Sequence, residues 1–485
     1  MGFLLRLLAR LPFLFIAGQL YGAAAVGRFA SALVIVELLA LVCSIGEKRG
    51  LAQRLADGKE ADPAGLIADA MLVALVLSGV AAAALYFVPA PLFPSGIYSD
   101  LDVWIVLAIP GYALTEIVLA AQAYRYDIAT TVRARAVVEP WTISLLAGVF
   151  FYVGPLRESG LAMAYLASIY AGLATALWSY IRSYGLPRQW SPHPVRLWRM
   201  TARAIPLAVA DAIEWGTRRL DIFILGLFAG PVAVGIYYMA QQVASLPQKL
   251  KTSFEPILGP VITARLKEKD YAAIARQVCQ VGFWIVAAQA GIALALGIPG
   301  EALMGLFGKG GEFVPGTGAL AFLLMAEVVA ATAVVAEAAL VYVARLRNLW
   351  VSIGTIVLQG LLTVVLMVII GRVDFAQPES ADYYRAAAAA GALMLALGVA
   401  SLVKATMLGR ILGHPINNWR WPLLWACAAA VVVGQIAILL PEWMELAFGI
   451  PAILAAYGWV IWTRGFGPED RVLFRRRLQD DDKPA

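Results

Sequence analysis

The stretch FIAGQLYGAAAVGRFASA, residues 15–32, recurs 208 residues later as FILGLFAGPVAVGIYYMA, residues 223–240. Eight of the 18 aligned positions are identical, and Phe29 pairs with the chemically similar Tyr237. Both copies stand among apolar segments of about 20 residues, the length of a helix that crosses a bilayer. The repeat therefore predicts a membrane protein of two halves, a plan that is common among transporters.

The composition supports the membrane assignment. Hydrophobic residues make up 61% of the 485-residue chain and charged residues only 14%, and the mean hydropathy is +0.77. Soluble domains carry about 25% charged residues. The three cysteines lie far apart, so we expect neither a disulfide framework nor a metal site. The sequence predicts an all-α, polytopic membrane protein without a resident cofactor, whose N-terminal segment is a signal anchor.

Hydropathy predicts about fourteen transmembrane helices. Basic residues are rare in the connections that follow odd-numbered helices, where only Arg28, Arg157, Lys309, Arg372 and Arg385 occur. Most other Lys and Arg residues fall in the even-to-odd connections and in the tails. The positive-inside rule then places both termini in the cytoplasm, and the net charge of +6 reflects this sidedness rather than nucleic-acid binding. The expected spans are 3–21, 27–46, 66–88, 101–122, 136–153, 160–181, 204–228, 234–258, 279–298, 317–342, 349–370, 383–408, 421–440 and 446–463.

The repeat copies fall on the first two helices and on the seventh and eighth. Six helices separate the copies, so both enter the membrane from the same side, and the repeat is parallel about an axis along the membrane normal. We expect two six-helix lobes and an additional C-terminal helix pair. The expected domains are the N-terminal lobe 1–182, a cytoplasmic linker 183–203, the C-terminal lobe 204–409, the extra helices 410–464 and a basic tail 465–485.

Several local patterns, in order along the chain, carry a family resemblance. The chain resembles the polysaccharide-biosynthesis flippases of the multidrug/oligosaccharidyl-lipid/polysaccharide exporter superfamily. The patterns are GRFASA at 27–32, QAYRY at 122–126 with RAR at 133–135, IPL at 205–207, RRLDIFILG at 218–226, VGIYYMA at 234–240, LP at 246–247 and the Pro256 to Pro260 segment.

The resemblance implies two lobes arranged in a V around a cavity. It also implies that the protein moves a polyprenyl-diphosphate-linked oligosaccharide from the cytoplasmic to the outer leaflet of the bacterial inner membrane. Such an oligosaccharide is the repeat unit of an O-antigen, an exopolysaccharide or a capsule. The expected partners are this lipid-linked oligosaccharide, membrane lipids, a polysaccharide polymerase and glycosyltransferases.

Charged residues on the predicted seventh helix are the first candidates for a binding site. A charge at the bilayer centre costs roughly 2.5–3.5 kcal/mol on insertion scales, so such residues must face a water-filled cavity or opposite charges. Arginine suits a diphosphate because its planar fork binds phosphate oxygens in pairs. Structural ion pairs at i, i+4 spacing and lysines that extend to the membrane surface are the alternatives. The substrate-binding candidates are Arg218, Arg219, Lys249, Lys251 and Asp221.

Acidic residues within predicted helices are candidates for coupling transport to H⁺ or Na⁺. Polar contacts between helices are the alternative interpretation. Glu139, which precedes Pro140, is expected to start a helix instead. The ion-coupling candidates are Glu37, Glu116, Glu327, Asp211 and Glu214.

Other function classes remain open or are disfavoured. The run from Gly308 to Gly311 lacks the Ser or Thr of a phosphate-binding loop, which argues against a built-in ATPase. The outer loops are short, which disfavours a membrane glycosyltransferase, polymerase or ligase. A multidrug antiporter of the same superfamily would favour an acid-lined lobe, and a flippase for the peptidoglycan lipid precursor stays open.

Overall fold

The computed structural model describes residues 11–46, 50–51, 54–55, 63–185, 187, 190–252, 262, 265–266, 268–375, 377–467 and 470. Within these ranges the side chains at 203–204, 214, 217–218, 246–252 and 378–379 are not described. The described residues form helices, turns and irregular segments, with no strand among them. The expected all-α class is confirmed.

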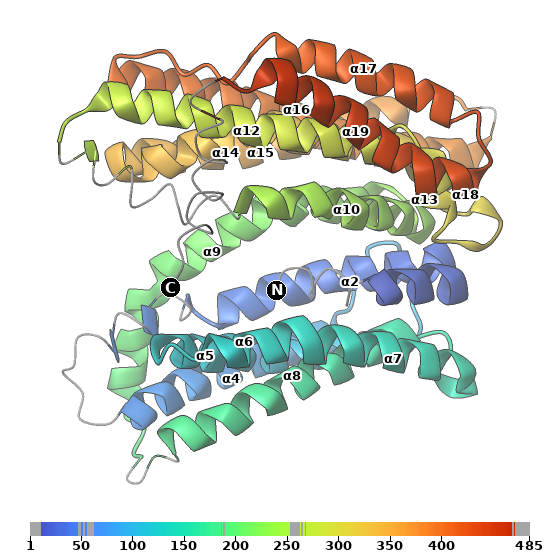
Figure 1. The fold of residues 1–485 in the computed structure, drawn as a ribbon. Coiled ribbons are helices and arrows are strands. Elements are labelled where there is room, and N and C mark those ends of the chain that lie inside the picture. The colour runs from blue at the N-terminus through green and yellow to red at the C-terminus, as the bar shows by residue number, and fades with distance from the viewer. Residues whose placement is uncertain are drawn as a thin grey trace, which may run out of the picture. The chain divides into compact units, whose positions relative to one another are not determined.

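The chain forms two compact units. The first comprises residues 1–238 and 307–312, and the second comprises residues 239–306 and 313–485. In the first unit, α8 packs against α5 and α7, and α2 packs against α5 and α9 (Figure 1). The helices of this unit are η1 (Ala17–Tyr21), α2 (Gly22–Cys43), α4 (Pro63–Phe87), η2 (Asp102–Leu107), α5 (Ala108–Tyr124), α6 (Ile128–Val132), η3 (Arg133–Val138), α7 (Glu139–Tyr152), η4 (Gly154–Leu156), α8 (Gly160–Tyr184), α9 (Pro194–Phe228), the start of α10 (Pro231–Thr252) and η5 (Lys309–Gly311).

In the second unit, α14 and α16 form the main helix pair. α15 packs against α16, α12 packs against α14, and the late helices α17 and α19 pair with each other and with α12. The helices of this unit, after the end of α10, are α12 (Tyr271–Gly297), α13 (Gly300–Gly305), η6 (Val314–Gly316), α14 (Thr317–Val343), α15 (Arg345–Ile370), α16 (Pro378–Leu412), α17 (Pro422–Ala437), α18 (Glu442–Met444), η7 (Glu445–Gly449), α19 (Ile450–Val460) and η8 (Ile461–Gly465).

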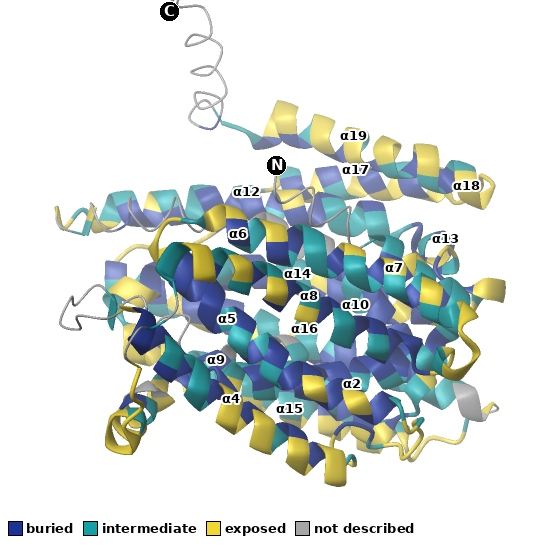
Figure 2. Ribbon diagram, turned by 90° about the horizontal axis from the view of Figure 1, so that it is seen from below, coloured by how far each residue is buried: buried dark blue, intermediate teal, exposed yellow. Residues whose placement is uncertain are grey.

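The described part of the chain contains ten helical stretches that are long and apolar enough to cross a membrane. Exposed residues cover the outward faces of helices such as α4, α15 and α19 in Figure 2. Many of these residues are large and apolar, including Val80, Val365 and Trp459. A surface of this kind suits a lipid environment, where apolar side chains are stable without burial in protein. The chain is a multi-pass membrane protein.

The stretch Leu11–Cys43 is one of the ten, yet it holds two helices that fold back on each other. The rings of Phe13 and Phe29 lie 5.9 Å apart, whereas sixteen residues along a straight helix would separate them by about 24 Å. Gly22 makes the reversal with a φ of 79°, a conformation that residues with a Cβ rarely adopt. This hairpin corresponds to the first two predicted helices.

Each remaining predicted segment also has a helix in the structure. The helices α9 and α10 are not among the ten because α9 carries many charged residues and α10 is less apolar, and α17 is shorter than the rest. The number of fourteen membrane crossings stays a prediction.

Two helix boundaries differ from the sequence-based prediction. α9 begins at Pro194, ten residues before the expected start at 204. The expected helix 136–153 starts at Ile128 and runs to Tyr152, so the expected loop at Arg133–Arg135 is wrong. The wide π-helical turn at Arg133–Val138 lies directly before Pro140, where the proline ring would clash with the carbonyl of a regular turn. Charged residues led the prediction to begin both helices too late.

The segment before α9 is fixed to the first unit by a buried carboxylate. Asp69 on α4 is fully buried. It accepts a hydrogen bond of 2.9 Å from the Trp190 indole and forms an ion pair with Arg196 in the first turn of α9. The expected linker 183–203 therefore contacts the first unit through Trp190 and Arg196.

The two copies of the repeat meet within the first unit. A Cβ placed on Gly27 would collide with the carbonyl oxygen of Pro231, and a Cβ placed on Gly235 would collide with that of Ala23. Adding 208 to positions 23 and 27 gives 231 and 235, so each contact is the repeat image of the other. Such reciprocal contact is the mark of a two-fold axis. Glycine at both positions allows the backbones of α2 and α10 to touch.

Candidate functional site

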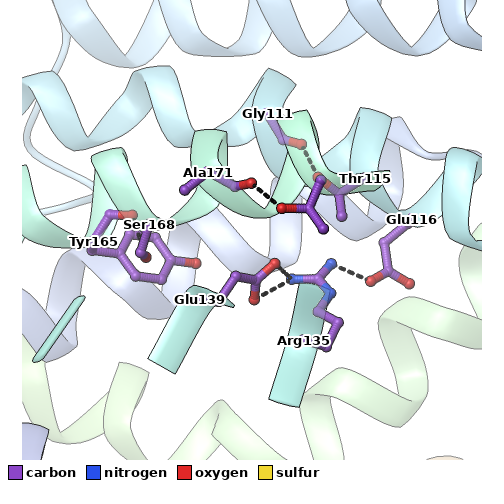
Figure 3. Close-up of polar contacts among 9 residues, drawn as sticks. Gly111, Thr115, Glu116, Arg135, Glu139, Tyr165, Ser168 and Ala171 are labelled. Atoms are coloured by element: carbon purple, nitrogen blue, oxygen red, sulfur yellow. Dashed lines mark hydrogen bonds and ion pairs between the residues drawn. The ribbon is translucent and has the colours of Figure 1, made fainter. Parts of the chain in front are cut away.

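Buried charges from four helical segments gather in the first unit. Arg135, in the π-helical turn, donates hydrogen bonds of 3.0 Å to both carboxylate oxygens of Glu139. Its other terminal nitrogen binds the carboxylate of Glu116 on α5. Figure 3 shows the Arg135 guanidinium between the two carboxylates. Each of the three side chains is only 14% exposed.

A second ion pair joins α2 to α9. The Nε atom of Arg219 lies 3.4 Å from a carboxylate oxygen of Glu37, and both side chains are largely buried. Arg219 also interacts electrostatically with Tyr112, Tyr238 and Asp221. This ion pair joins α2, which contains the second half of the first repeat copy, to α9, which contains the start of the second copy.

Tyr112 connects the two ion pairs. Its ring lies under the Arg135 guanidinium at 4.4 Å from the ring centroid, a cation–π geometry. Its hydroxyl interacts electrostatically with the carboxylates of Glu37, Glu116 and Glu139. We call these residues, with both arginines, the charged network.

Tyr165 on α8 adds a polar hydroxyl group beside the charged network. Its hydroxyl is buried and has no hydrogen-bond partner among the described residues. In Figure 3 it points toward Glu139. It also interacts electrostatically with Glu37 and Arg135. A buried hydroxyl without a partner is costly, so this position suits a group that gains a partner in another state of the network.

Among the described residues, the network holds more carboxylates than guanidinium groups. Three carboxylates, Glu37, Glu116 and Glu139, face two guanidinium groups, Arg135 and Arg219, among the described residues. Because Arg135 divides its nitrogens between two carboxylates, loss of either partner would release part of its fork to bind another anion. The arrangement can therefore exchange a proton or a cation against an anionic group.

Sequence reasoning identified part of this network. Glu37, Glu116 and Arg219 were candidates, whereas Arg135 was assigned to a loop. Glu139 is the first residue of α7, as expected, but the helical stretch Ile128–Tyr152 continues through it, so it also faces Arg135 one turn earlier. The i, i+4 spacing of Arg135 and Glu139 was the signal that could have placed them on one helix face.

The structure describes the side chains of three of the other candidates and not those of the remaining four. Asp221 is fully buried, and its carboxylate accepts hydrogen bonds from the Tyr237 hydroxyl and the Ile222 amide. Asp211 is also buried on α9. Glu327 is half-buried on α14 of the second unit. The side chains of Arg218, Glu214, Lys249 and Lys251 lie outside the described part of the structure.

The second unit buries a separate ion pair that the sequence did not indicate. Lys404 on α16 is buried, and its ammonium lies 2.8 Å from Glu337 on α14 and 3.3 Å from the Ser352 hydroxyl. The Asn348 amide donates a 3.3 Å hydrogen bond to the same glutamate. The lysine of this cluster already supplies the cation that its carboxylate needs.

The described residues contain no group of His, Cys, Asp or Glu side chains that could hold a metal ion.

The family model for "Polysaccharide biosynthesis protein" matches residues 3–263, more than half of the chain. The chain belongs to this family. None of the curated proteins compared with the chain matches it. The family resemblance drawn from the sequence is confirmed.

Solved structures show the same fold. The lipid II flippase MurJ in an inward closed conformation has a TM-score of 0.70 at 11% identity, covering 98% of each chain. A multidrug resistance MATE family transporter in an inward-facing conformation has a TM-score of 0.67 at 15% identity, covering 85% of this chain and 95% of its own. The Vibrio cholerae MATE transporter VcmN in its bent form has a TM-score of 0.52 at 12% identity, covering 84% of this chain and 96% of its own. These proteins are flippases and transporters rather than enzymes.

Proposed function

We propose that the protein moves a polyprenyl-diphosphate-linked oligosaccharide from the cytoplasmic to the outer leaflet of the bacterial inner membrane. The observation that carries the proposal is the charged network inside the helices of a polysaccharide-biosynthesis family member. Two buried arginines at a helix contact would be unusual in a packed membrane interior without a functional reason. Both termini face the cytoplasm in this proposal, and glycosyltransferases and a polymerase act before and after transport.

The two described arginines are suited to the diphosphate. Arg219 lies between α9 and α2, and Arg135 lies between α5 and α7. A guanidinium binds phosphate oxygens in pairs and stays charged in a low-dielectric site. We also propose Arg218, Lys249 and Lys251 as substrate-binding cations and Asp221, which accepts a hydrogen bond from the Tyr237 hydroxyl, as a further substrate-binding residue.

The carboxylates supply the coupling step. When Glu116 or Glu139 takes up a proton, Arg135 loses one of its two anionic partners. The released nitrogens can then bind a phosphate oxygen of the substrate. Loss of the proton restores the ion pair and expels the diphosphate. Glu37 couples Arg219 in the same way, and Asp211, Glu214 and Glu327 remain candidates for H⁺ or Na⁺ binding.

A multidrug antiporter is the second candidate, favoured by the carboxylate surplus. An organic cation would take the place that we assign to the proton, and the three carboxylates would bind it directly. The MATE structures with the same fold are consistent with this alternative. A flippase for lipid II-type substrates shares the chemistry of our main proposal and differs only in the glycan.

The test is complementation of a strain that lacks the gene. We expect Arg219→Ala and Arg135→Gln to abolish surface polysaccharide while the protein remains in the membrane, and Arg219→Lys to restore export only partly because lysine lacks the fork. Arg265→Ala is the matched control, since that arginine is exposed in an i, i+3 pair with Glu268.

Two outcomes would contradict the proposal. Normal polysaccharide in the strain without the gene, together with new drug sensitivity, would favour the antiporter. Normal export by an Arg135→Gln, Arg219→Ala double variant would separate the network from the transported diphosphate. Protein abundance in the membrane fraction distinguishes loss of transport from loss of folding.

A further inference from the structure

A cavity of about 620 Å³ lies in the first unit, away from the charged network's ion pairs. Three chain connections form it: the Gly22 turn, the loop after α4 and the loop between α7 and α8. These are the first three connections that follow odd-numbered helices. The basic loops at Arg125 and Arg182 belong to the other end of the same helices. The cavity therefore opens on the side that loop charge assigns to the cell exterior.

Both outer arginines of the N-terminal half line this cavity. Arg28 and Arg157 are the two basic residues of the first three outer connections, and the fold brings them together. The Nε atom of Arg28 lies 3.1 Å from Asp102, and a terminal nitrogen donates a 3.2 Å hydrogen bond to the Glu158 carbonyl. The exposed Arg157 guanidinium lies 4.6 Å from the centroid of the Phe151 ring.

Aromatic rings in fixed orientations complete the lining. Tyr98 stacks on Phe93 with centroids 4.9 Å apart and an angle of 18°, and 39% of the tyrosine remains exposed. Tyr21 packs edge-on against Phe151 at 5.3 Å and donates a 2.7 Å hydrogen bond to the Ala147 carbonyl. Rings held in this way offer flat apolar faces at little entropic cost.

The lining favours a neutral, polyhydroxylated ligand over a phosphate. The charge of Arg28 is matched by Asp102, and Glu158 lines the cavity together with Arg157. A dianion would have to compete with both carboxylates. A sugar ring instead offers a C–H face to an aromatic ring and hydroxyl groups to Arg, Glu and Ser, and the volume falls within the range of ordinary ligand sites.

We propose that this cavity binds the glycan of the lipid-linked substrate on the outer side, after the diphosphate has crossed. This inference rests on the proposed function and adds a second, glycan-specific site to it. Tyr98 provides the stacking platform, and Arg157 and Glu158 provide hydrogen bonds to hydroxyl groups. The site would contribute to the choice of glycan and hold the product until it leaves for polymerisation.

The test measures binding of a soluble probe to the full-length protein in lipid nanodiscs. The probe is the oligosaccharide repeat released by mild acid from the lipid-linked fraction of the host, and calorimetry gives the affinity. We expect Tyr98→Ala and Arg157→Gln each to weaken binding by about tenfold or more. Tyr152→Ala is the matched control, because Tyr152 is exposed at the end of α7 and does not line the cavity.

The outcomes separate this inference from the proposed function. Equal affinity in the wild type, Tyr98→Ala and Arg157→Gln, or no binding by the wild type, would overturn the glycan site. Competition by inorganic pyrophosphate at the same concentration as the oligosaccharide would also overturn it in favour of an anion site. Export by the Arg219→Ala variant tests the proposed function on its own, since that substitution leaves the cavity intact.

Discussion

Among the described residues, an arginine of the first unit is shared between two largely buried carboxylates, whereas Lys404 of the second unit pairs with a single, half-exposed glutamate. Arg135 shares its guanidinium between Glu116 and Glu139, and the nearby Tyr165 hydroxyl has no partner among the described residues. Lys404 instead has a carboxylate, and a serine hydroxyl beside it. In the first arrangement one guanidinium can exchange one partner for another, while in the second each charge already has its own partner. The difference suggests that transport chemistry belongs to the first unit and stabilisation to the second.

The largest expected effect comes from removing the shared cation of the first unit. Arg135→Ala would leave Glu116 and Glu139 buried without their partner, which costs roughly 3–5 kcal/mol for a buried pair. We expect a strong fall in the thermal unfolding temperature of the purified protein. Arg182→Ala is the control, since Arg182 is exposed beside Trp178. An unfolding temperature equal to that of the control would refute a shared-cation role.

The next effect tests the contact between the repeat copies. Gly27→Ala and Gly235→Ala would each drive a methyl group into a backbone carbonyl. Overpacking of this kind costs about 1–3 kcal/mol. The two substitutions should have similar effects because their contacts are repeat images of each other.

Gly226→Ala is the control for this pair. Its Cβ would lie 3.6 Å from the Ser31 hydroxyl oxygen, an ordinary contact, and alanine favours the helix. Denaturation in detergent should show it as neutral or stabilising. A Gly27→Ala protein as stable as Gly226→Ala would mean that α2 and α10 do not touch at this point.

A smaller effect is expected in the second unit. Lys404→Met removes the ammonium but keeps an apolar stem of similar length, and Glu337 is 43% exposed, so its carboxylate can be solvated. We expect a loss of about 1 kcal/mol or less and little change in export. A Glu337→Gln substitution should act similarly. Complete loss of export by Lys404→Met at normal abundance would move transport chemistry into the second unit.

The sequence was sufficient for the helices but not for the charged side chains inside them. Apolar runs marked every long helix that the structure describes, and the repeat identified positions 27 and 235 as equivalent before their contact was known. Hydropathy, however, treats a charge as a reason to end a helix. Arg135 was therefore placed in a loop and Glu139 at a helix start, although each is largely buried within one helical stretch. Which carboxylate faces which arginine depends on tertiary contacts such as that of Arg219 with Glu37, and these cannot be obtained from spacing on one helix.

The smallest expected effect concerns Asp127, which caps the helical stretch that carries Arg135. The Thr130 hydroxyl, followed by the Thr130 amide and the Ser179 hydroxyl, stabilises the ionised carboxylate and lowers the pKa of Asp127 below its ordinary value of 3.8. Because the folded-state pKa is depressed, this contribution is present above the unfolded-state pKa and is lost as the pH falls through the folded-state value. Asp127→Ala should cost about 0.5–2 kcal/mol at neutral pH through loss of the cap, and Asp127→Asn should cost less.

The difference in stability between the wild type and Asp127→Asn should begin to shrink as the pH falls below the ordinary value of 3.8 and should continue to shrink through the lower folded-state pKa, where the wild-type carboxyl also becomes neutral. Chemical denaturation at pH 7 and pH 3 measures it. Since the cap begins the helix that positions Arg135, the variant should also shift the pH dependence of export slightly, whereas a purely local cap would change stability alone. An unchanged difference between the two pH values would show that the ionised form of Asp127 does not stabilise the cap.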